Sequence, residues 1–329
     1  MNPAIPLEYR CNQAGPVARR SIWRVLQFIV GALLVALAVR SIVHNWENLR
    51  AQSLDWQLSP SLIALSVLTV FAAYAILIEA WRRVVLSMGE QLPFLTAVRI
   101  WFLASLGKYI PGKVWAIAGA AVLARRAGVD PSVAVAGALV LQALALASGV
   151  AAVGLTAAES FRALGSAALP IAAGLLVLSA AGLAALSSQS ILDRFSRYLP
   201  SSLPRLRAVG GAHLTLAFAA NLVAWGLYGA ALLLLARGVL PTVSLSLSQA
   251  IGVFTCSYLA GFVALFAPGG LGPRESVFLL LLAGAIGLKP AAGLALASRL
   301  LLTATEILPA VPFLLYRGAS SPPSIREVS

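Results

Sequence analysis

Six long apolar runs constrain the fold of this chain more than any other feature of its sequence. A helix needs about 20 apolar residues to cross the hydrocarbon core of a bilayer. The runs cover residues 23–43, 61–80, 132–156, 169–187, 213–235 and 291–316. Only 11% of the 329 residues are charged, against about 25% in soluble domains. The sequence therefore excludes a soluble domain and predicts an all-α, polytopic helical membrane protein with about six full spans.

Two further apolar regions, residues 94–124 and 248–288, are interrupted near their middles. The interruptions are Pro111-Gly112 and Pro268-Gly269, which lie 157 residues apart, close to half of the chain. Irregular backbone at membrane depth is tolerated only beside a cavity or inside protein, and paired broken segments indicate a transporter binding site. This spacing favours an internal inverted repeat. Ordinary Pro-Gly kinks in two membrane helices are the alternative.

The distribution of basic residues predicts how the chain crosses the membrane. A formal net charge of +13 would indicate nucleic-acid binding in a soluble protein, but in a membrane protein it sets orientation, so we expect no nucleic-acid partner. Fifteen of the 24 Lys and Arg residues fall in five segments that can share one side of the membrane. These segments are residues 1–24, 81–99, 124–131, 188–212 and the C-terminal tail. By the positive-inside rule, both termini are cytoplasmic.

This topology makes region 94–124 a re-entrant hairpin, because it begins and ends on the cytoplasmic side. Region 248–288 forms either two short spans or a hairpin that enters from the outer side. We divide the chain into a cytoplasmic tail (1–22), a single transmembrane domain (23–317) and a second cytoplasmic tail (318–329).

The sequence offers little material for a metal, a cofactor or a catalytic group. Its two cysteines, Cys11 and Cys256, and its two histidines lie far apart, which predicts neither a disulfide framework nor a metal site. The stretch from Gly107 to Lys113 nearly matches a phosphate-binding P-loop, but Val114 replaces the hydroxyl residue that binds magnesium. We therefore expect no ATPase site, no cofactor and no catalytic residue.

The first Pro-Gly turn nevertheless has the features of a phosphate-binding site. Pro111 ends one half-helix, Gly112 permits a sharp turn, and a second half-helix begins near Val114. The start of a helix attracts anions, and Lys108 and Lys113 add positive charge beside it. The alternative is that both lysines extend from a shallow hairpin to the lipid headgroups.

The second turn combines glycines with a cation. Gly269, Gly270 and Gly272 allow the backbone to approach a ligand closely, and Arg274 and Glu275 follow. An arginine between apolar segments suits bidentate recognition of phosphate. Glu275 is also favourable at a helix start for dipole reasons alone.

The last apolar run carries charged residues on one face. Arg299, Thr303 and Glu306 are spaced four and three residues apart, which places them along one side of a helix. Arg299 and Glu306 are about 10 Å apart along the axis, so each needs a partner elsewhere. A pair between Arg274 and Glu306 is one testable arrangement. The alternative for Arg299 is that it lies near the outer interface and reaches the headgroups.

Three motifs carry a resemblance to a known family. GKYIPGKVW (107–115), RRAGV (125–129) and APGGLGPRES (267–276) resemble the lysylphosphatidylglycerol synthase transmembrane family, also called flippase-like integral membrane proteins, over roughly residues 20–317. The resemblance implies a bacterial or archaeal plasma membrane protein, related to the flippase half of aminoacyl-phosphatidylglycerol enzymes and to proteins of lipid-linked glycosylation. By motif position it points to the two turns and their charged neighbours. Pro273 stands where the family more often has an aliphatic residue.

The bifunctional members of that family carry a soluble aminoacyl-transferase domain after the membrane part. Only about a dozen polar residues follow Tyr316 here, so we expect no aminoacyl transfer. The leading hypothesis is a lipid translocator, not an enzyme, that moves a phospholipid or a polyprenyl-phosphate-linked lipid. A membrane enzyme for lipid-linked substrates and an accessory scaffold for a glycosyltransferase partner are the alternatives.

Overall fold

The computed structural model of the chain describes residues 57–109, 114–160, 166–196, 209–264 and 267–315. Within these residues the chain consists of α-helices and short 3-10 segments joined by turns, without a β-strand. The expected first span at 23–43, both expected tails and residues 110–113 lie outside the described residues.

Five long helices confirm five of the six expected spans. Each is long and apolar enough to cross a membrane, so the chain is a multi-pass membrane protein. They are α3 (Pro60–Ser87), α6 (Pro131–Ser160), α7 (Ala168–Ser187), α9 (Gly211–Val239) and α12 (Leu288–Leu315). A short helix, α8 (Gln189–Ser196), follows α7.

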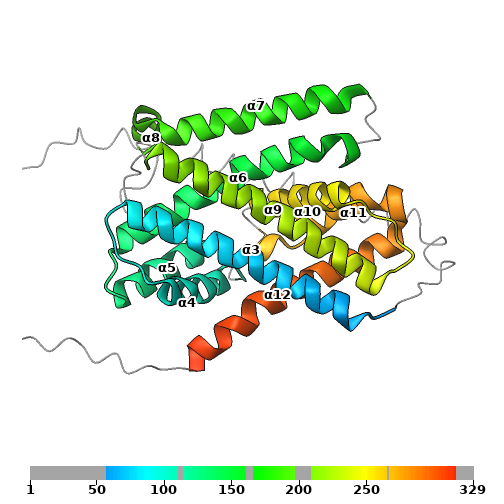
Figure 1. Cartoon of the computed structure of the whole chain (residues 1–329), viewed down its shortest axis with the longest axis horizontal. Coiled ribbons are helices and arrows are strands. Elements are labelled where there is room, and N and C mark those ends of the chain that lie inside the picture. The colour runs from blue at the N-terminus through cyan, green and yellow to red at the C-terminus, as the bar shows by residue number, and fades with distance from the viewer. Residues whose placement is uncertain (1–56, 110–113, 161–165, 197–208, 265–266, 316–329) are drawn as a thin grey trace, which may run out of the picture.

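The first interrupted region is a hairpin, as predicted. Helix α4 (Phe94–Ser105) leads into a 3-10 turn, η2 (Leu106–Tyr109), and the chain returns in α5 (Val114–Arg126), which packs against α4. The hairpin starts just after α3 ends and finishes just before α6 begins. Both of its open ends therefore lie at one end of the long helices (Figure 1).

The second interrupted region also folds as two helices joined by a short turn, an arrangement that both of its expected forms share. Helix α10 (Leu247–Val263), the 3-10 turn η4 (Pro268–Gly270) and α11 (Pro273–Ile286) follow one another, and α10 packs against α11. Its open ends adjoin the end of α9 and the start of α12, at the end of the molecule opposite to that of α4 and α5 (Figure 1).

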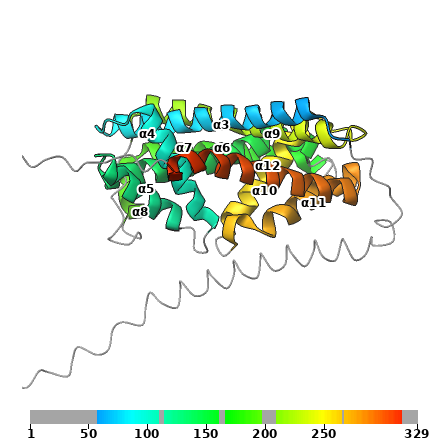
Figure 2. The same ribbon diagram turned by 90° about the horizontal axis from the view of Figure 1, so that it is seen from below.

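The two hairpins give the chain the form of an inverted repeat. The order long helix, hairpin, long helix occurs twice, as α3, α4–α5, α6 and as α9, α10–α11, α12. Helices α3 and α9 lie antiparallel and in extensive contact, as the two views in Figures 1 and 2 show. The Ser66 hydroxyl of α3 donates to the Ala231 carbonyl of α9 at 2.7 Å in this contact. The two hairpins therefore enter from opposite ends of one central helix pair.

Helix α7 lies at the margin of the bundle and packs mainly on α6. Its only buried side chains are Ala168 and Ser179, and the Ser179 hydroxyl donates to the Ala147 carbonyl of α6 at 2.8 Å. Most of its apolar surface, including Val177 and Leu178, is exposed. An apolar surface of this size is the face that a membrane protein presents to lipid.

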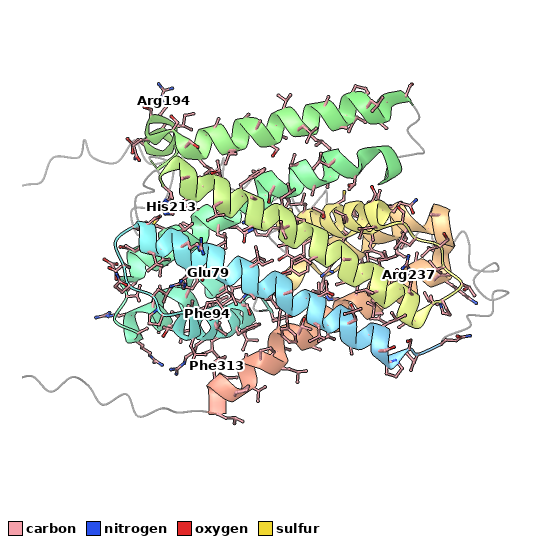
Figure 3. The ribbon with its side chains drawn as sticks, in the orientation of Figure 1. Glu79, Phe94, Arg194, His213, Arg237 and Phe313 are labelled. Atoms are coloured by element: carbon pink, nitrogen blue, oxygen red, sulfur yellow. The ribbon has the colours of Figure 1, made fainter. Side chains whose placement is uncertain are left out.

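The two ends of the bundle differ in charge. The end at which α3 finishes carries most of the described basic residues outside the centre, and Figure 3 shows Arg194 and His213 there and Arg237 at the other end. The basic residues of the first end are Arg82, Arg83, Arg99, Arg125, Arg126 and Arg194. The other end has Arg237 and Lys289. We call the first end the basic end.

The turn between α5 and α6 at the basic end is closed by Asp130. Its carboxylate accepts hydrogen bonds from the Ser132 hydroxyl and the Ser132 backbone N–H, each at 2.7 Å. These bonds lower the pKa of the Asp130 carboxyl. A charged cap of this kind favours the start of α6 at Pro131.

Candidate functional site

The turns of the two hairpins meet inside the bundle. Segments η2 and η4 are in contact, and a Cβ atom added to Gly269 would lie 3.7 Å from a Tyr109 ring carbon and 3.1 Å from the Arg299 guanidinium. Gly269, Gly270 and Gly272 have φ angles of 58°, 72° and 89°, a region that residues with a Cβ rarely adopt. Glycine is therefore required at these three positions by backbone conformation, and the predicted close approach of this turn to a ligand stays a prediction.

The tight turn also needs a small residue on the helix that it approaches. A Cβ on Gly261 of α10 would lie 3.0 Å from the Arg274 Cβ and 3.4 Å from the Gly270 Cα. Gly261→Ala should lower the free energy of unfolding by about 1 kcal/mol, because overpacking a tight contact costs more than alanine gains in helix propensity.

Gly284 of α11 is the matched control for this substitution, since a Cβ there meets no atom within 4 Å. Gly284→Ala should leave stability unchanged or raise it slightly. Thermal unfolding in detergent, followed by loss of the monodisperse size-exclusion peak, measures both variants. Equal behaviour of the two would contradict the close approach of the turn to α10.

Glu306 of α12 joins the first hairpin to the central helices. Its side chain is 10% exposed and forms an ion pair with Lys108 of η2. The Tyr109 hydroxyl donates to its Oε2 at 2.7 Å, and the Tyr74 hydroxyl of α3 donates to its Oε1 at 3.2 Å. One buried carboxylate thus accepts three hydrogen bonds from two different elements.

Arg299, two turns earlier on α12, joins the second hairpin. Its guanidinium forms an ion pair with Glu275 and donates to the Gly269 carbonyl at 3.2 Å. The second Glu275 oxygen accepts from the Gly272 backbone N–H at 2.8 Å, so Glu275 caps the start of α11. The Arg299 side chain is only 16% exposed, and the alternative in which it extends to the headgroups is wrong.

Arg274 is the most buried cation of the site, with 9% of its surface exposed. It donates to the Ser298 hydroxyl at 3.3 Å. Its guanidinium carbon lies 5.3 Å from the centre of the Phe254 ring and 5.8 Å from that of Tyr258, which are cation–π contacts. The aromatic wall continues through Tyr228 and Trp225 of α9.

The predicted pair between Arg274 and Glu306 is wrong. Arg274 lies at the level of Ser298, which precedes Glu306 by eight residues on α12, or about 12 Å along the axis. The Glu306 carboxylate accepts hydrogen bonds from Lys108 and two tyrosines instead. The expectation that Arg299 and Glu306 each have a separate partner is confirmed.

The charges of this site do not balance within the described residues. Its cations are Lys108, Arg274 and Arg299, and its carboxylates are Glu275 and Glu306. Each carboxylate is paired with one cation, which leaves Arg274 without a carboxylate within 4 Å in the described part of the chain. The centre therefore carries an excess of positive charge in a region where charge is costly.

Eight of the predicted site residues meet here, and three others lie outside the described residues. Lys108, Gly269, Gly270, Gly272, Arg274, Glu275, Arg299 and Glu306 come together. Pro111, Gly112 and Lys113 lie outside the described residues, and α5 begins at Val114 as expected. Lys108 pairs with Glu306 in the interior, so the shallow-hairpin alternative is wrong for this lysine. Pro273 is compatible with the motif, because it occupies the first position of α11, which favours proline.

Two tyrosines of the site, Tyr74 and Tyr109, were not predicted as site residues. The Tyr109 hydroxyl donates to Glu306. Tyr74 lies in the middle of a predicted span, and a buried tyrosine hydroxyl needs a hydrogen-bond partner. That requirement was the available signal, and it indicates a polar centre without identifying the partner.

The fold and this centre define a multi-pass helical membrane protein with two opposed helical hairpins, whose turns meet at a buried, positively charged site. Residues 24–310 match the family described as the lysylphosphatidylglycerol synthase TM region, and the chain belongs to that family. The family relates the chain to lipid modification or lipid flipping. A comparison with curated protein sequences finds no match.

Proposed function

We propose that this protein translocates lipids with a phosphate-bearing headgroup, either a phospholipid or a polyprenyl-phosphate-linked lipid, between the leaflets of its membrane. The observation that carries the proposal is the excess positive charge where the two hairpin turns meet. Arg274 supplies this charge, held by Ser298 and two aromatic rings instead of a carboxylate. A headgroup phosphate can replace the Ser298 contact with a charge-assisted bond, which is stronger than a neutral one.

The two ion pairs support the same role. Lys108–Glu306 and Arg299–Glu275 neutralise four charges at the turns, which lowers the cost of placing them in the membrane. A single uncompensated guanidinium then attracts one anionic group. The lipid chains remain in the bilayer, against the apolar outer faces of the helices.

A transport role fits these residues better than catalysis. Glu275 and Glu306 are the carboxylates of the described site, and both are engaged by cations and by helix-cap or tyrosine hydrogen bonds. A general base or a metal ligand needs a carboxylate available to the substrate. We place the protein in a bacterial or archaeal plasma membrane with both termini cytoplasmic, and uphill movement then depends on a gradient or on a partner such as a glycosyltransferase.

Purified protein in phosphatidylcholine vesicles tests the proposal. Headgroup-labelled phospholipid and short-chain polyprenyl phosphate are added in trace amounts, and an impermeant quencher reports the fraction that reaches the outer leaflet. We expect protein-containing vesicles to expose nearly all of the probe within minutes, and protein-free vesicles about half. A chelator should leave the rate unchanged, whereas loss of activity with chelator would favour a metal-dependent membrane enzyme.

A further inference from the structure

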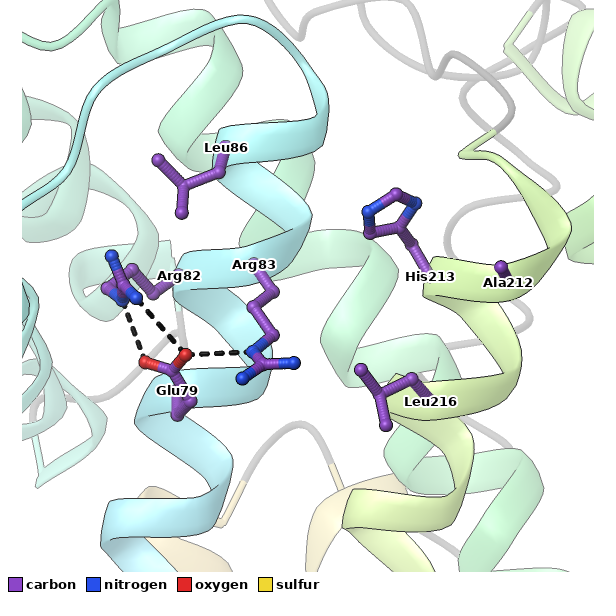
Figure 4. Close-up of a pocket in the computed structure, with 7 residues that line it drawn as sticks. All are labelled: Glu79, Arg82, Arg83, Leu86, Ala212, His213 and Leu216. Carbon is purple, nitrogen blue, oxygen red and sulfur yellow. Dashed lines mark hydrogen bonds and ion pairs between the residues drawn. The ribbon is translucent and has the colours of Figure 1, made fainter.

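A second positively charged site lies at the basic end, away from the centre. A pocket of about 350 Å³ opens between the last turns of α3 and the first turn of α9, and Figure 4 shows the side chains that line it. Arg83 on its α3 wall follows Tyr74 by nine residues, or about 13 Å along the helix. The pocket is therefore separate from the cluster around Glu306.

One carboxylate in this pocket serves two guanidinium groups. Glu79 accepts from Arg82 Nε at 2.7 Å, from Arg82 Nη2 at 3.2 Å and from Arg83 Nε at 2.8 Å. The third nitrogen of Arg82 donates to the Leu92 carbonyl at 3.4 Å. Each of the three Arg82 nitrogens thus donates one hydrogen bond, and the pocket carries one positive charge more than its carboxylate neutralises.

Arg83 is the more exposed of the two arginines and keeps both terminal nitrogens available. Its side chain is 53% exposed, and within the described residues its two terminal nitrogens donate no hydrogen bond. In Figure 4 this guanidinium points into the space between α3 and α9, where the His213 ring and Leu216 form the opposite wall. An imidazole can add a further donor to an anion bound there.

We propose that this pocket binds the phosphate of an anionic membrane lipid. The two free nitrogens of Arg83 match the bidentate geometry that guanidinium groups use for phosphate. Leu86 and Leu216 give the pocket apolar walls for the glycerol part of a lipid. Basic pockets between transmembrane helices bind anionic headgroups in this way, and the position at the ends of two spanning helices favours a lipid over free phosphate.

Native mass spectrometry of the purified full chain in detergent tests this site, with dioleoyl phosphatidylglycerol and dioleoyl phosphatidylcholine as probes. Arg83→Gln should weaken the tightest phosphatidylglycerol binding event about tenfold, since one charge-assisted contact contributes 1.5 to 3 kcal/mol, roughly a factor of ten or more. Phosphatidylcholine binding should not change. The variant should stay folded, because Glu79 keeps both bonds from Arg82.

Arg126→Gln is the matched control, because Arg126 is exposed at the same basic end but does not line the pocket. It should retain wild-type phosphatidylglycerol binding. His213→Ala should give a smaller loss than Arg83→Gln. Equal binding by the wild-type protein and Arg83→Gln, or equal losses in Arg83→Gln and Arg126→Gln, would overturn the proposal. Displacement of the lipid by millimolar inorganic phosphate would also count against it. These outcomes concern binding at the basic end and do not depend on translocation through the centre.

Discussion

Arg274→Gln is expected to reduce lipid translocation about a hundredfold in reconstituted vesicles. The reason is that this side chain supplies the one positive charge at the meeting point of the hairpins that no described carboxylate neutralises. Loss of a desolvated charged contact costs about 2 to 5 kcal/mol, which corresponds to factors from tens to thousands. Rates are measured with the headgroup-labelled probes and impermeant quencher described above.

Two further variants make this result specific. Arg274→Lys keeps the charge but lacks the planar fork of donors, so its rate should fall between those of the wild type and the glutamine variant. Arg237→Gln removes a basic residue at the other end of α9 and should not change the rate. Size-exclusion profiles check folding, because Arg274 packs against Phe254 and Tyr258. A well-folded Arg274→Gln protein with the wild-type rate would refute the proposed role.

The second large effect is expected at Glu306. Glu306→Gln leaves Lys108 in the interior without its counter-charge. Breaking a buried ion pair by removing one partner costs 3 to 5 kcal/mol, and because 31% of the Lys108 side chain is exposed, we expect about 3 kcal/mol. This loss corresponds to a fall of roughly 5 to 10 °C in the apparent unfolding temperature.

The double variant Lys108→Gln/Glu306→Gln separates charge from packing. It removes both charges at once and keeps side chains of similar length, so it should recover at least half of the lost stability. Tyr74→Phe, which deletes one of three donors to Glu306, should cost about 1 kcal/mol. Stability of Glu306→Gln equal to that of the wild type would show that the pair with Lys108 does not hold the first hairpin in place.

Hydropathy and turn residues were sufficient to predict the framework. Long apolar runs require helices at membrane depth, because unpaired backbone groups are too costly there. A Pro-Gly pair inside such a run forces a turn, and the return of the chain to its starting side follows from the basic residues at 81–99 and 124–131. The sequence did not decide the form of the second hairpin, because region 248–288 has few charged residues that indicate which side of the membrane it enters from.

The pairing of side chains across the centre could not be predicted in the same way. Helical spacing correctly placed Arg299 and Glu306 on one face, but it does not determine which hairpin reaches which level of α12. Arg274 and Glu306 have opposite charges and would satisfy any rule based on sequence, yet Arg274 donates to Ser298, which precedes Glu306 by eight residues, or about 12 Å along α12. Lys108 takes the place beside Glu306, because the first hairpin turn reaches that level.

The inverted repeat has a consequence for directionality. Two halves with the same fold and opposite orientation present equivalent structures to the two membrane surfaces. The scaffold itself therefore gives transport no preferred direction. A preferred direction has to come from unequal lipid concentrations in the two leaflets or from the residues in which the halves differ. One such difference lies in the turns, where η2 is followed by no counterpart of Arg274 and Glu275 within the described start of α5. A preference for one direction of travel would therefore reside in a few side chains, and could be altered without changing the fold.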